Sequence, residues 1–440
     1  MKSLTMASSV FFVILGVSFS FPSHAAEIGF GEIWSSIQSR SNSIKGARLE
    51  AGIAEKASER ASLHWLPSLS LGGRYFTTND PGVSLFSRLG QRQILSADFG
   101  PAALNEPGFQ NYGLLSLQAE LPIYEGGAKE SLRAAAAYWQ ESQERLLDAR
   151  EIGLHARTAS DFGRILSLHQ AKKQSLALRT EIEKILGRYS LGSRSNPVGY
   201  SGMLGLKALQ NRILSVLESF RSEEAGLKAR ISTLAGIDAA WIPLDGLVIG
   251  FVEENLPKPA ARIPTREEEA ARLAALGAAE QANSEKSRYL PGVGLFGNES
   301  WNTGARGSAF TTTAGVYLRW SLFTPDSWNR QSEAELRSKR ESLRAEEASE
   351  QTKISFEGLS AHAAALESNL KLVSESEELL AEQTRITLRL FRDGAIGALS
   401  LAEALNRRVD LLLDRVRLES SWIEDRSALQ SYRSREGVRE

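Results

Sequence analysis

The sequence predicts an α+β protein made of two β-hairpins and long antiparallel coiled-coil helices, arranged as an internal two-fold repeat. Segments of alternating apolar and polar residues occur in pairs, which indicates strands. Each pair is followed by very long, nearly proline-free segments rich in Ala, Leu, Glu and Arg, which indicates helices. The same order of segments then occurs a second time, and a repeat of this size determines the architecture before any single motif does.

Composition narrows the possible functions. The 440 residues carry a net charge of -1, so the basic excess expected of a nucleic-acid binder is absent. There is no cysteine, which excludes disulfides, thiol catalysis and thiolate metal sites. The five histidines include no pair at i, i+4 spacing, and no phosphate loop or nucleophile elbow is present. We therefore expect no enzyme, no metal and no cofactor, and we expect the histidines to make hydrogen bonds on or between helices.

Residues 1–25 are predicted to be a signal peptide. Lys2 gives a basic start, Val10 to Val17 are apolar, and small residues at Ser23 and Ala25 precede the expected cleavage site. The apolar run is shorter than the roughly 20 residues of a membrane-spanning helix. An N-terminal anchor or a buried helix is the alternative.

The first repeat is predicted to occupy residues 26–236. A helix over about 31–64 leads into a hairpin at about 65–124, whose strands are separated by a long loop rich in Gly, Pro, Asn and Asp. Pro122 and the Gly126–Gly127 pair are expected to end the second strand. The elements that follow are a helix at about 128–187, a turn at about 189–197, and a second long helix. At 1.5 Å per residue the first of these helices is about 90 Å long, more than most globular domains need.

The second repeat is predicted at residues 265–440, after a proline-containing connector at 237–264. Thr265 and Glu268 have the spacing of a capping box that opens its first helix. The remaining predicted elements are a hairpin at about 289–323, a long helix at about 327–390, a turn at about 391–398 and a last helix at about 399–432.

The alternation predicts strands with one purely apolar face and one polar or small face, with aromatic residues near the strand ends. This pattern is typical of outer-membrane barrel strands, although a small soluble sheet packed on a helix would also produce it. The residues predicted to face lipid are Leu69, Leu71, Leu115, Leu117, Leu121, Val316, Leu318 and Trp320.

Two hairpins supply only four strands, too few to close a barrel, and a sheet in lipid cannot leave its edges open. If these strands span a membrane, several protomers must share one barrel. The long helices carry small and apolar residues at spacings of three and four, which suits packing against neighbouring helices. The sequence alone does not distinguish a solid helical bundle from a helical tube.

The segments "LPSLSLGG", "LPIYEGGAKESLRAA", "RYSLGS" and "LFRDGAIGALSLAEAL", in this order and duplicated, resemble the TolC family of outer-membrane channels over essentially the whole mature chain. The resemblance implies a homotrimer with a twelve-stranded barrel in the outer membrane and a tube of twelve helices in the periplasm. It implies a passive exit duct for small molecules, working with a periplasmic adaptor protein and an inner-membrane pump. The alternatives are a type I protein-secretion channel of the same fold and a periplasmic coiled-coil structural protein without a pore.

The resemblance also implies functional residues at the helical end. The periplasmic turns expected to meet the adaptor contain Tyr189, Leu191, Gly192, Ser193, Phe391, Asp393, Gly394 and Ala395. The pore-entrance positions are Ser400 and Glu403, of which only Glu403 is acidic, so the entrance is expected to carry one ring of three carboxylates where some members carry two such rings.

Two positions depart from the family pattern. Asn196–Pro197 follows the first turn, so the next helix is expected to start late or to be kinked. The second hairpin ends in "LFTPD" without a glycine pair, and Asp326 is expected to cap the helix after it. The long loop of the first hairpin, about residues 77–111, is expected to be extracellular.

Leu117→Asp and Val316→Asp should each abolish assembly in the outer membrane, because a charge on a lipid-facing strand position must be desolvated. The measurement is the amount of trimer recovered from the outer-membrane fraction. Normal trimers in that fraction would count against these strands spanning lipid.

Overall fold

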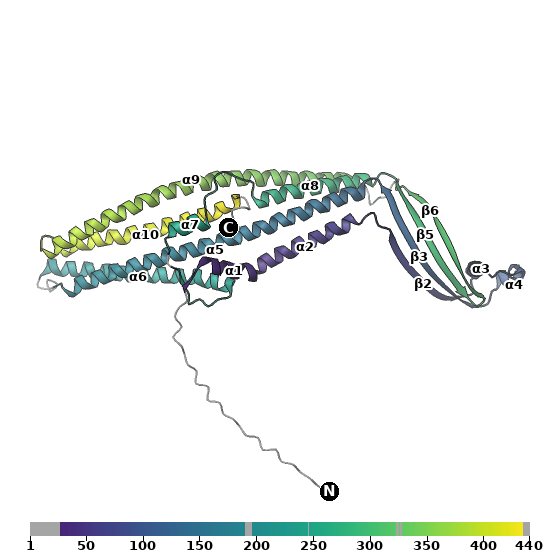
Figure 1. Cartoon of the computed structure of the whole chain (residues 1–440), viewed down its shortest axis with the longest axis horizontal. Coiled ribbons are helices and arrows are strands. Elements are labelled where there is room, and N and C mark those ends of the chain that lie inside the picture. Colours follow the sequence, from purple (N-terminus) through teal and green to yellow (C-terminus); the bar gives the residue numbers. More distant parts are fainter. Residues whose placement is uncertain (1–26, 190–195, 245, 323–324, 326–327, 434–440) are drawn as a thin grey trace, which may run out of the picture.

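The computed structural model describes residues 27–189, 196–244, 246–322, 325 and 328–433. The predicted signal peptide lies outside this range, as does Asp326 with its predicted capping role. The molecule is elongated, with a bundle of long helices at one end that runs directly into a β-sheet at the other (Figure 1). The sequence-based α+β class therefore holds for the single chain.

The sheet at the end of the molecule contains the two hairpins side by side. Its strands are β2 (Ser68–Thr78), β3 (Gln110–Glu125), β5 (Gly292–Gly304) and β6 (Gly307–Arg319), all antiparallel and in the order β2-β3-β5-β6. β3 and β5, one from each repeat, pair at the centre. β2 and β6 are consequently the two edges, and each has one side without a partner strand among the described residues.

The two hairpins differ in how their strands are joined. Gly304 pairs with Gly307, so β5 and β6 are connected by a two-residue turn. The β2–β3 connection, expected to be an irregular loop, instead contains α3 (Pro81–Gly90), the 3₁₀ helix η1 (Ser96–Phe99) and α4 (Pro101–Asn105). Helix formation here is explained by local residues, because Pro81 suits the first helical position and the Asp80 carboxylate accepts a 2.7 Å hydrogen bond from the Val83 N–H.

The exit from β3 into the first long helix depends on two glycines. Gly126 and Gly127 have φ values of 66° and 83°, and a Cβ at Gly126 would lie 2.4 Å from the Ser287 carbonyl oxygen. Pro122 was expected to help end the strand, but the strand continues past it. β3 continues to Glu125, and Pro122 is tolerated in this central strand because the register shifts by one residue beside it.

Two helices run the length of the helical region, α5 (Ala128–Gly187, 60 residues) and α9 (Arg330–Arg392, 63 residues). Shorter helices pack against them in two tiers (Figure 1). The tier near the sheet contains α2 (Asn42–Ser62) and α8 (Arg266–Ser287), and the tier far from the sheet contains α6 (Pro197–Ala235) and α10 (Ala398–Leu429). The chain therefore forms four helical columns.

Small elements join the two tiers at mid-length. They are β1 (Glu27–Ile28), α1 (Phe30–Arg40), β4 (Ile242–Pro243), α7 (Val248–Asn255) and the 3₁₀ helix η3 (Gln430–Tyr432). β1 and β4 pair in parallel, and α1 and α7 pack on the middle of α5. The connector between the repeats is thus a packed part of the fold.

The main hydrophobic core lies at this junction and contains a cluster of aromatic rings among aliphatic side chains. Phe162 on α5 stacks on Trp241 at 5.9 Å between centroids and also contacts Phe251 on α7 at 5.1 Å. The neighbouring Gly163 lets α7 and α10 approach, because a Cβ there would lie 3.3 Å from Phe251 and 3.4 Å from Ile423. A second core lies nearer the helical tips and is formed by α5, α6 and α10.

Two helix starts differ from their sequence-based description. α6 begins at Pro197 itself, since proline suits the first helical position and the Asn196 side chain caps the Gly199 N–H at 3.1 Å. Thr265 does cap α8 by accepting from the Glu268 N–H at 3.1 Å. The Glu268 carboxylate, however, contacts Arg262 and Ser349 instead of completing a capping box.

One buried carboxylate couples α10 to α5. Glu419 accepts a hydrogen bond from the Ser167 hydroxyl and lies 3.4 Å from the Arg415 guanidinium, whose other partner is Glu377 at 3.0 Å. Burial raises the pKa of the Glu419 carboxyl above its ordinary value. The folded protein therefore binds this proton more tightly than the unfolded chain, and stability falls as pH rises above the ordinary glutamate range.

Glu419→Gln, which mimics the protonated side chain, should raise the melting temperature at pH 7.5. The advantage should shrink as pH falls toward about 4.5, where wild-type Glu419 is itself protonated. Circular dichroism melts at several pH values measure this, with the exposed Glu218→Gln as control. A pH-independent difference between Glu419→Gln and wild type would contradict the titration argument.

Candidate channel wall and helical tips

The strand register places most apolar residues of the four strands on one face of the sheet, whereas Leu114 and Phe296 lie on the other face. Leu71 lies opposite Leu117, and Leu295 lies opposite Val316. Directly opposed residues in antiparallel strands point to the same side, so the apolar positions form a continuous surface. This surface is uncovered in the single chain, with Val316 67% exposed and Leu318 68% exposed. An uncovered apolar sheet face of this size needs an apolar environment or a partner.

The apolar face has one charged position that the sequence analysis missed. Glu299 on β5 lies between Leu117 on β3 and Thr312 on β6, and its side chain is exposed. The expectation of a purely apolar face is therefore wrong here. The register shift beside Pro122 also matters, because it places Tyr124 opposite Val293. Neither position could be assigned before the pairing of β3 with β5 was known.

The opposite face of the sheet is polar. Arg319 on β6 lies 3.3 Å from the Glu120 carboxylate on β3, across the intervening strand β5. Asn302 on β5 donates to the Thr311 hydroxyl of β6 at 3.3 Å. Such side chains remain solvated and hydrogen bonded on a surface that faces water.

The two helical tips lie together at the end of the molecule farthest from the sheet (Figure 1). Tyr189 after α5 and Phe391 at the end of α9 stack with 5.9 Å between ring centroids and a 28° interplanar angle. The Tyr189 hydroxyl also donates to the Gly199 carbonyl oxygen of α6 at 3.0 Å. These two turn residues, 202 positions apart, thus belong to one structural unit. The other predicted residues of the first turn, Leu191, Gly192 and Ser193, lie outside the described residues.

The second tip reverses direction at a glycine. Asp393 is the C-cap of α9, and Gly394 follows with φ 74°, a left-handed conformation. The N–H of Ala395 donates to the Leu390 carbonyl at 2.9 Å, which closes the helix end. A Cβ built on Gly394 meets nothing within 4 Å, so backbone conformation alone favours glycine there.

A cavity of about 1020 Å³ opens between the two tips. Its lining combines apolar side chains with basic ones, and Val198 on its rim is 80% exposed. Lining residues include Lys184, Arg188, Tyr189, Val198, Phe391 and Ala395. A concave surface with aromatic and basic side chains is suited to hold part of another polypeptide.

The predicted pore-entrance residues lie at the start of α10. Ser400 and Glu403 are both exposed and one turn apart, on the side opposite the buried Leu401 and Leu405. Arg407, one further turn along the same face, is also exposed. The sequence analysis did not single out Arg407, although its i+4 spacing from Glu403 could have identified it.

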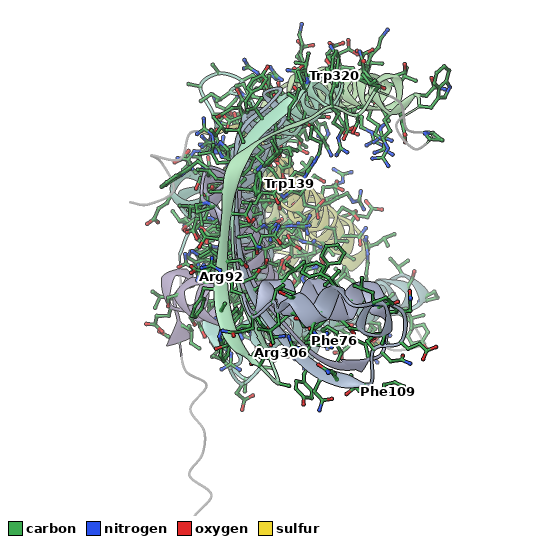
Figure 2. The ribbon with its side chains drawn as sticks, turned by 90° about the vertical axis from the view of Figure 1, so that its right-hand side faces the viewer. Phe76, Arg92, Phe109, Trp139, Arg306 and Trp320 are labelled. Atoms are coloured by element: carbon green, nitrogen blue, oxygen red, sulfur yellow. The ribbon has the colours of Figure 1, made fainter. Side chains whose placement is uncertain are left out.

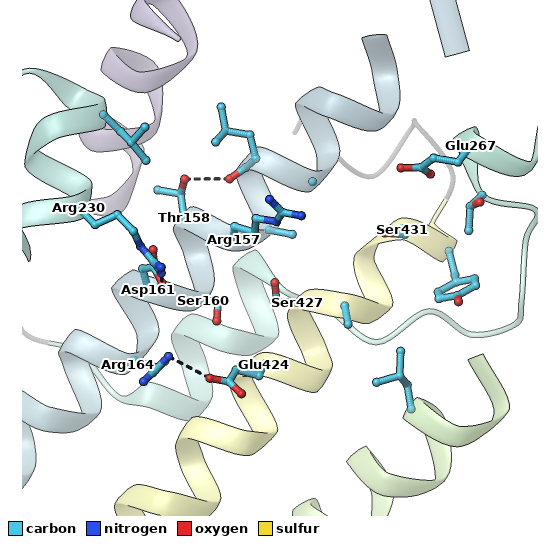
Figure 3. A pocket seen from close by; sticks show the side chains of 18 of the residues that line it. Arg157, Thr158, Ser160, Asp161, Arg164, Arg230, Glu267, Glu424, Ser427 and Ser431 are labelled. Carbon is cyan, nitrogen blue, oxygen red and sulfur yellow. Dashed lines mark hydrogen bonds and ion pairs between the residues drawn. The ribbon is translucent and has the colours of Figure 1, made fainter. Parts of the chain in front are cut away.

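A polar cavity of about 950 Å³ lies at mid-length, among α5, α6 and α10 (Figure 3). Arg164 on α5 contacts Glu223 on α6 at 2.7 Å and Glu424 on α10 at 2.9 Å. Arg230 on α6 pairs with Asp161 on α5. The sequence could not reveal this cluster because the two residues of each ion pair are 59 to 260 positions apart. The ion pairs tie the three helices together across a solvated gap.

Among the described residues, no group of three His, Asp or Glu side chains could hold a metal ion. His155 departs from the expected hydrogen-bonding role, since its ring packs edge-on against Phe30 and Trp34 at 5.4 and 4.9 Å, and burial lowers its pKa. In the described part of the chain, no helix has the length and apolar character needed to cross a membrane.

Comparison with solved structures gives the same fold over almost the whole chain. CusC, described as forming a transmembrane channel, aligns with a TM-score of 0.74 at 11% identity, covering 93% of this chain and 92% of CusC. The outer-membrane protein VceC of Vibrio cholerae gives 0.71 at 16%, covering 91% and 94%. The open state of the MtrE outer-membrane channel of Neisseria gonorrhoeae gives 0.72 at 15%, covering 92% and 88%. No family model and no curated protein matches the sequence.

The chain therefore has a TolC-like fold, the fold of outer-membrane channels. The resemblance noted in the sequence motifs is confirmed at the level of three-dimensional structure, with sequence identity low throughout.

Gly394→Asn should leave the second tip nearly unchanged, because asparagine tolerates the left-handed conformation and the space is open. Gly394→Val should destabilise the tip by about 1–2 kcal/mol, the cost of a left-handed conformation for an ordinary residue. Amide hydrogen exchange over residues 389–398 measures the difference. Equal protection in both variants would show that φ is not the constraint at this position.

Proposed function

We propose that this protein is the outer-membrane subunit of a tripartite efflux complex, a passive duct through which small molecules leave the cell. The observation that carries the proposal is a sheet with one exposed apolar face, one polar face and two open edges, joined directly to helices about 90 Å long. A sheet of this kind suits a barrel in lipid, and helices of this length suit a tube that crosses a periplasm.

The open edges support a homotrimer. β2 and β6 each leave one row of backbone N–H and C=O groups without a partner strand, which lipid does not tolerate. If β6 of one copy pairs with β2 of the next, three copies of the four-stranded sheet close a barrel of twelve strands. A barrel of that size is wide enough to enclose water, with the polar face lining the lumen.

The helical columns support a tube below the barrel. Each chain supplies α5, α9 and two tiered columns, α2 with α6 and α8 with α10. Three copies give twelve columns, which continue the barrel wall at the corner made by Gly126 and Gly127. No nucleotide-binding motif is found in the sequence, so the proposed energy source is an inner-membrane pump.

The helical tips are the proposed docking site for a periplasmic adaptor protein. The groove between them, lined by Lys184, Tyr189 and Phe391, fits an amphipathic helical hairpin with acidic side chains at its edge. The proposed contact set also includes Asp393, Gly394 and Ala395 of the second tip, together with the undescribed first-turn residues Leu191, Gly192 and Ser193. The stacked Tyr189–Phe391 pair keeps both tips in one geometry for this contact.

Ser400 and Glu403 are the proposed lining of the pore entrance. In a trimer each position is present three times around the axis, which gives one ring of carboxylates and one ring of hydroxyls. Three carboxylates around a narrow opening attract cations and repel anions. The exposure of both side chains on α10 is compatible with such a ring.

Single-channel recording of the mature protein in a planar bilayer tests the proposal. Detergent-extracted trimers should insert and give discrete, small conductance steps, since the entrance is narrow. A protein that stays monomeric and never inserts would leave the pore-free coiled-coil protein as the explanation.

Glu403→Ala should raise conductance and lower the preference for cations. Glu403→Gln should lower the cation preference alone, because it removes charge and keeps size. Glu357→Ala, an exposed position on α9, is the control. If Glu403→Ala and Glu403→Gln both match wild type, Glu403 is not at the entrance.

A further inference from the structure

The connection between β2 and β3 forms a folded cap over residues 79–109, and this cap lies on the polar face of the sheet. Tyr112 donates from its hydroxyl to the Ser84 carbonyl oxygen of α3 at 3.4 Å. A Cβ on Gly90, at the end of α3, would lie 2.9 Å from the Asn302 side chain of β5. On β3, Tyr112 is three residues from Leu115, and on β5, Asn302 is next to Trp301. Because successive side chains in a strand point to opposite faces, Tyr112 and Asn302 both lie on the polar face.

Seen along the long axis, the cap lies across the hollow side of the curved sheet (Figure 2). This agrees with the contacts of α3 with β5 and β6. α4 lies beyond the strand ends (Figure 1), whereas α3 is held against β5 and β6. α3 therefore lies over the side that becomes the lumen when a barrel closes.

A buried charge cluster holds the cap in place. Asp98 of η1 is 2% exposed and lies 3.0 Å from Arg88 of α3. It also makes two contacts, at 2.6 and 2.7 Å, with Arg306 in the β5–β6 turn. Its Oδ2 accepts from the Leu95 N–H at 2.8 Å. Because Arg306 belongs to the other hairpin, the cluster fastens the cap across the sheet.

The amphipathic pattern of α3 is the inverse of that of an ordinary surface helix, because its polar side chains are buried and its apolar side chains are exposed. Its polar residues Ser84 and Arg88 are buried, Ser84 beside Tyr112 of β3 and Arg88 beside Asp98 of η1. Its apolar residues Val83, Phe86 and Leu89, spaced three apart, are exposed, and Phe86 is 71% exposed. We call these three residues the cap face. Other apolar side chains of the same cap are also exposed, namely Leu95, Phe99 and Phe109.

We propose that the cap faces of three copies of this chain pack against one another and close the extracellular mouth of the channel. The inference rests on the proposed trimer. When the barrel closes, the cap faces point away from the wall and toward the axis, where the same face of each neighbour lies. An apolar surface in a water-filled lumen is unfavourable unless it is covered.

A second copy is favoured over other occupants of the cap face. Lipid is disfavoured because the cap is on the polar side of the sheet, away from the apolar face. Like-charge repulsion between copies is small because the cap together with Arg306 has no net charge: Arg88, Arg92 and Arg306 are matched in number by Asp80, Asp98 and Glu106. The contact also continues the copy-to-copy interface that the edges β2 and β6 require.

Cross-linking tests the contact. Because the chain has no native cysteine, only the introduced cysteine can react. Phe86→Cys in the membrane-embedded protein should give disulfide-linked dimers on oxidation and covalent trimers with a three-armed maleimide. Thr312→Cys, on the apolar face of β6, is the matched control and should give neither. Trimer formation is scored separately by native gel.

The outcomes separate the two proposals. Native trimers without a Phe86→Cys cross-link would overturn the cap contact and leave the proposed channel intact. Failure to form trimers at all would overturn both. A cross-link from Phe86→Cys to a different protein, in place of a second copy, would overturn the cap contact in favour of an external partner.

A labelling experiment tests the consequence for the channel. Thr313→Cys lies on the polar face of β6, deeper than the cap, and should react slowly with a bulky, membrane-impermeant maleimide added outside intact cells. Adding Phe86→Asp should speed labelling by about tenfold or more, because three carboxylates at the axis repel one another. Phe86→Leu should leave the rate unchanged. Equal rates for Phe86→Asp and its parent, with trimers present, would overturn closure by the cap.

Discussion

The two unpaired edges of the four-stranded sheet constrain the rest of the molecule. β2 and β6 each carry backbone groups that need partners, and the sheet between them exposes an apolar face on one side. In water both features favour aggregation, and in lipid the open edges are prohibitive. Closure by further copies satisfies both requirements at once. The proposed trimer, with its polar lumen and its tube of helices below the barrel, meets this requirement of backbone hydrogen bonding.

The corner at Gly126 and Gly127 connects the sheet directly to the long helix α5. Gly126 and Gly127 let the chain turn directly from β3 into α5, which then reaches the tips without a break. The aromatic core around Phe162 fixes the middle of α5, and the stack of Tyr189 on Phe391 fixes its far end. The sheet and the tips therefore lie at the two ends of one stiff element. On the proposed function, a partner bound at the tips acts on the same helices that hold the barrel.

Repeating patterns were readable because they arise from local geometry. Period-two alternation identified strand residues such as Leu117 and Val316, and the absence of proline identified the two helices of 60 and 63 residues. Predictions failed where a contact overrode a local preference. Pro122 remained within β3 because a register shift accommodates it, and the turn-rich loop at 77–111 folded into helices because Asp80 and Pro81 start α3. Glu299 was missed because its face depends on pairing with a distant strand.

Residue order alone was sufficient for the class of the protein: the duplicated hairpins, the long helices, the glycine turns and the absence of catalytic motifs can all be read within windows of a few tens of residues. The cap, the mid-length ion pairs and the shared tip required the folded chain. Asp98 meets Arg306 across 208 positions, and Arg164 meets Glu424 across 260. Such pairs produce no periodic pattern in the sequence, because the residues next to a side chain in the sequence do not indicate which distant element will pack against it.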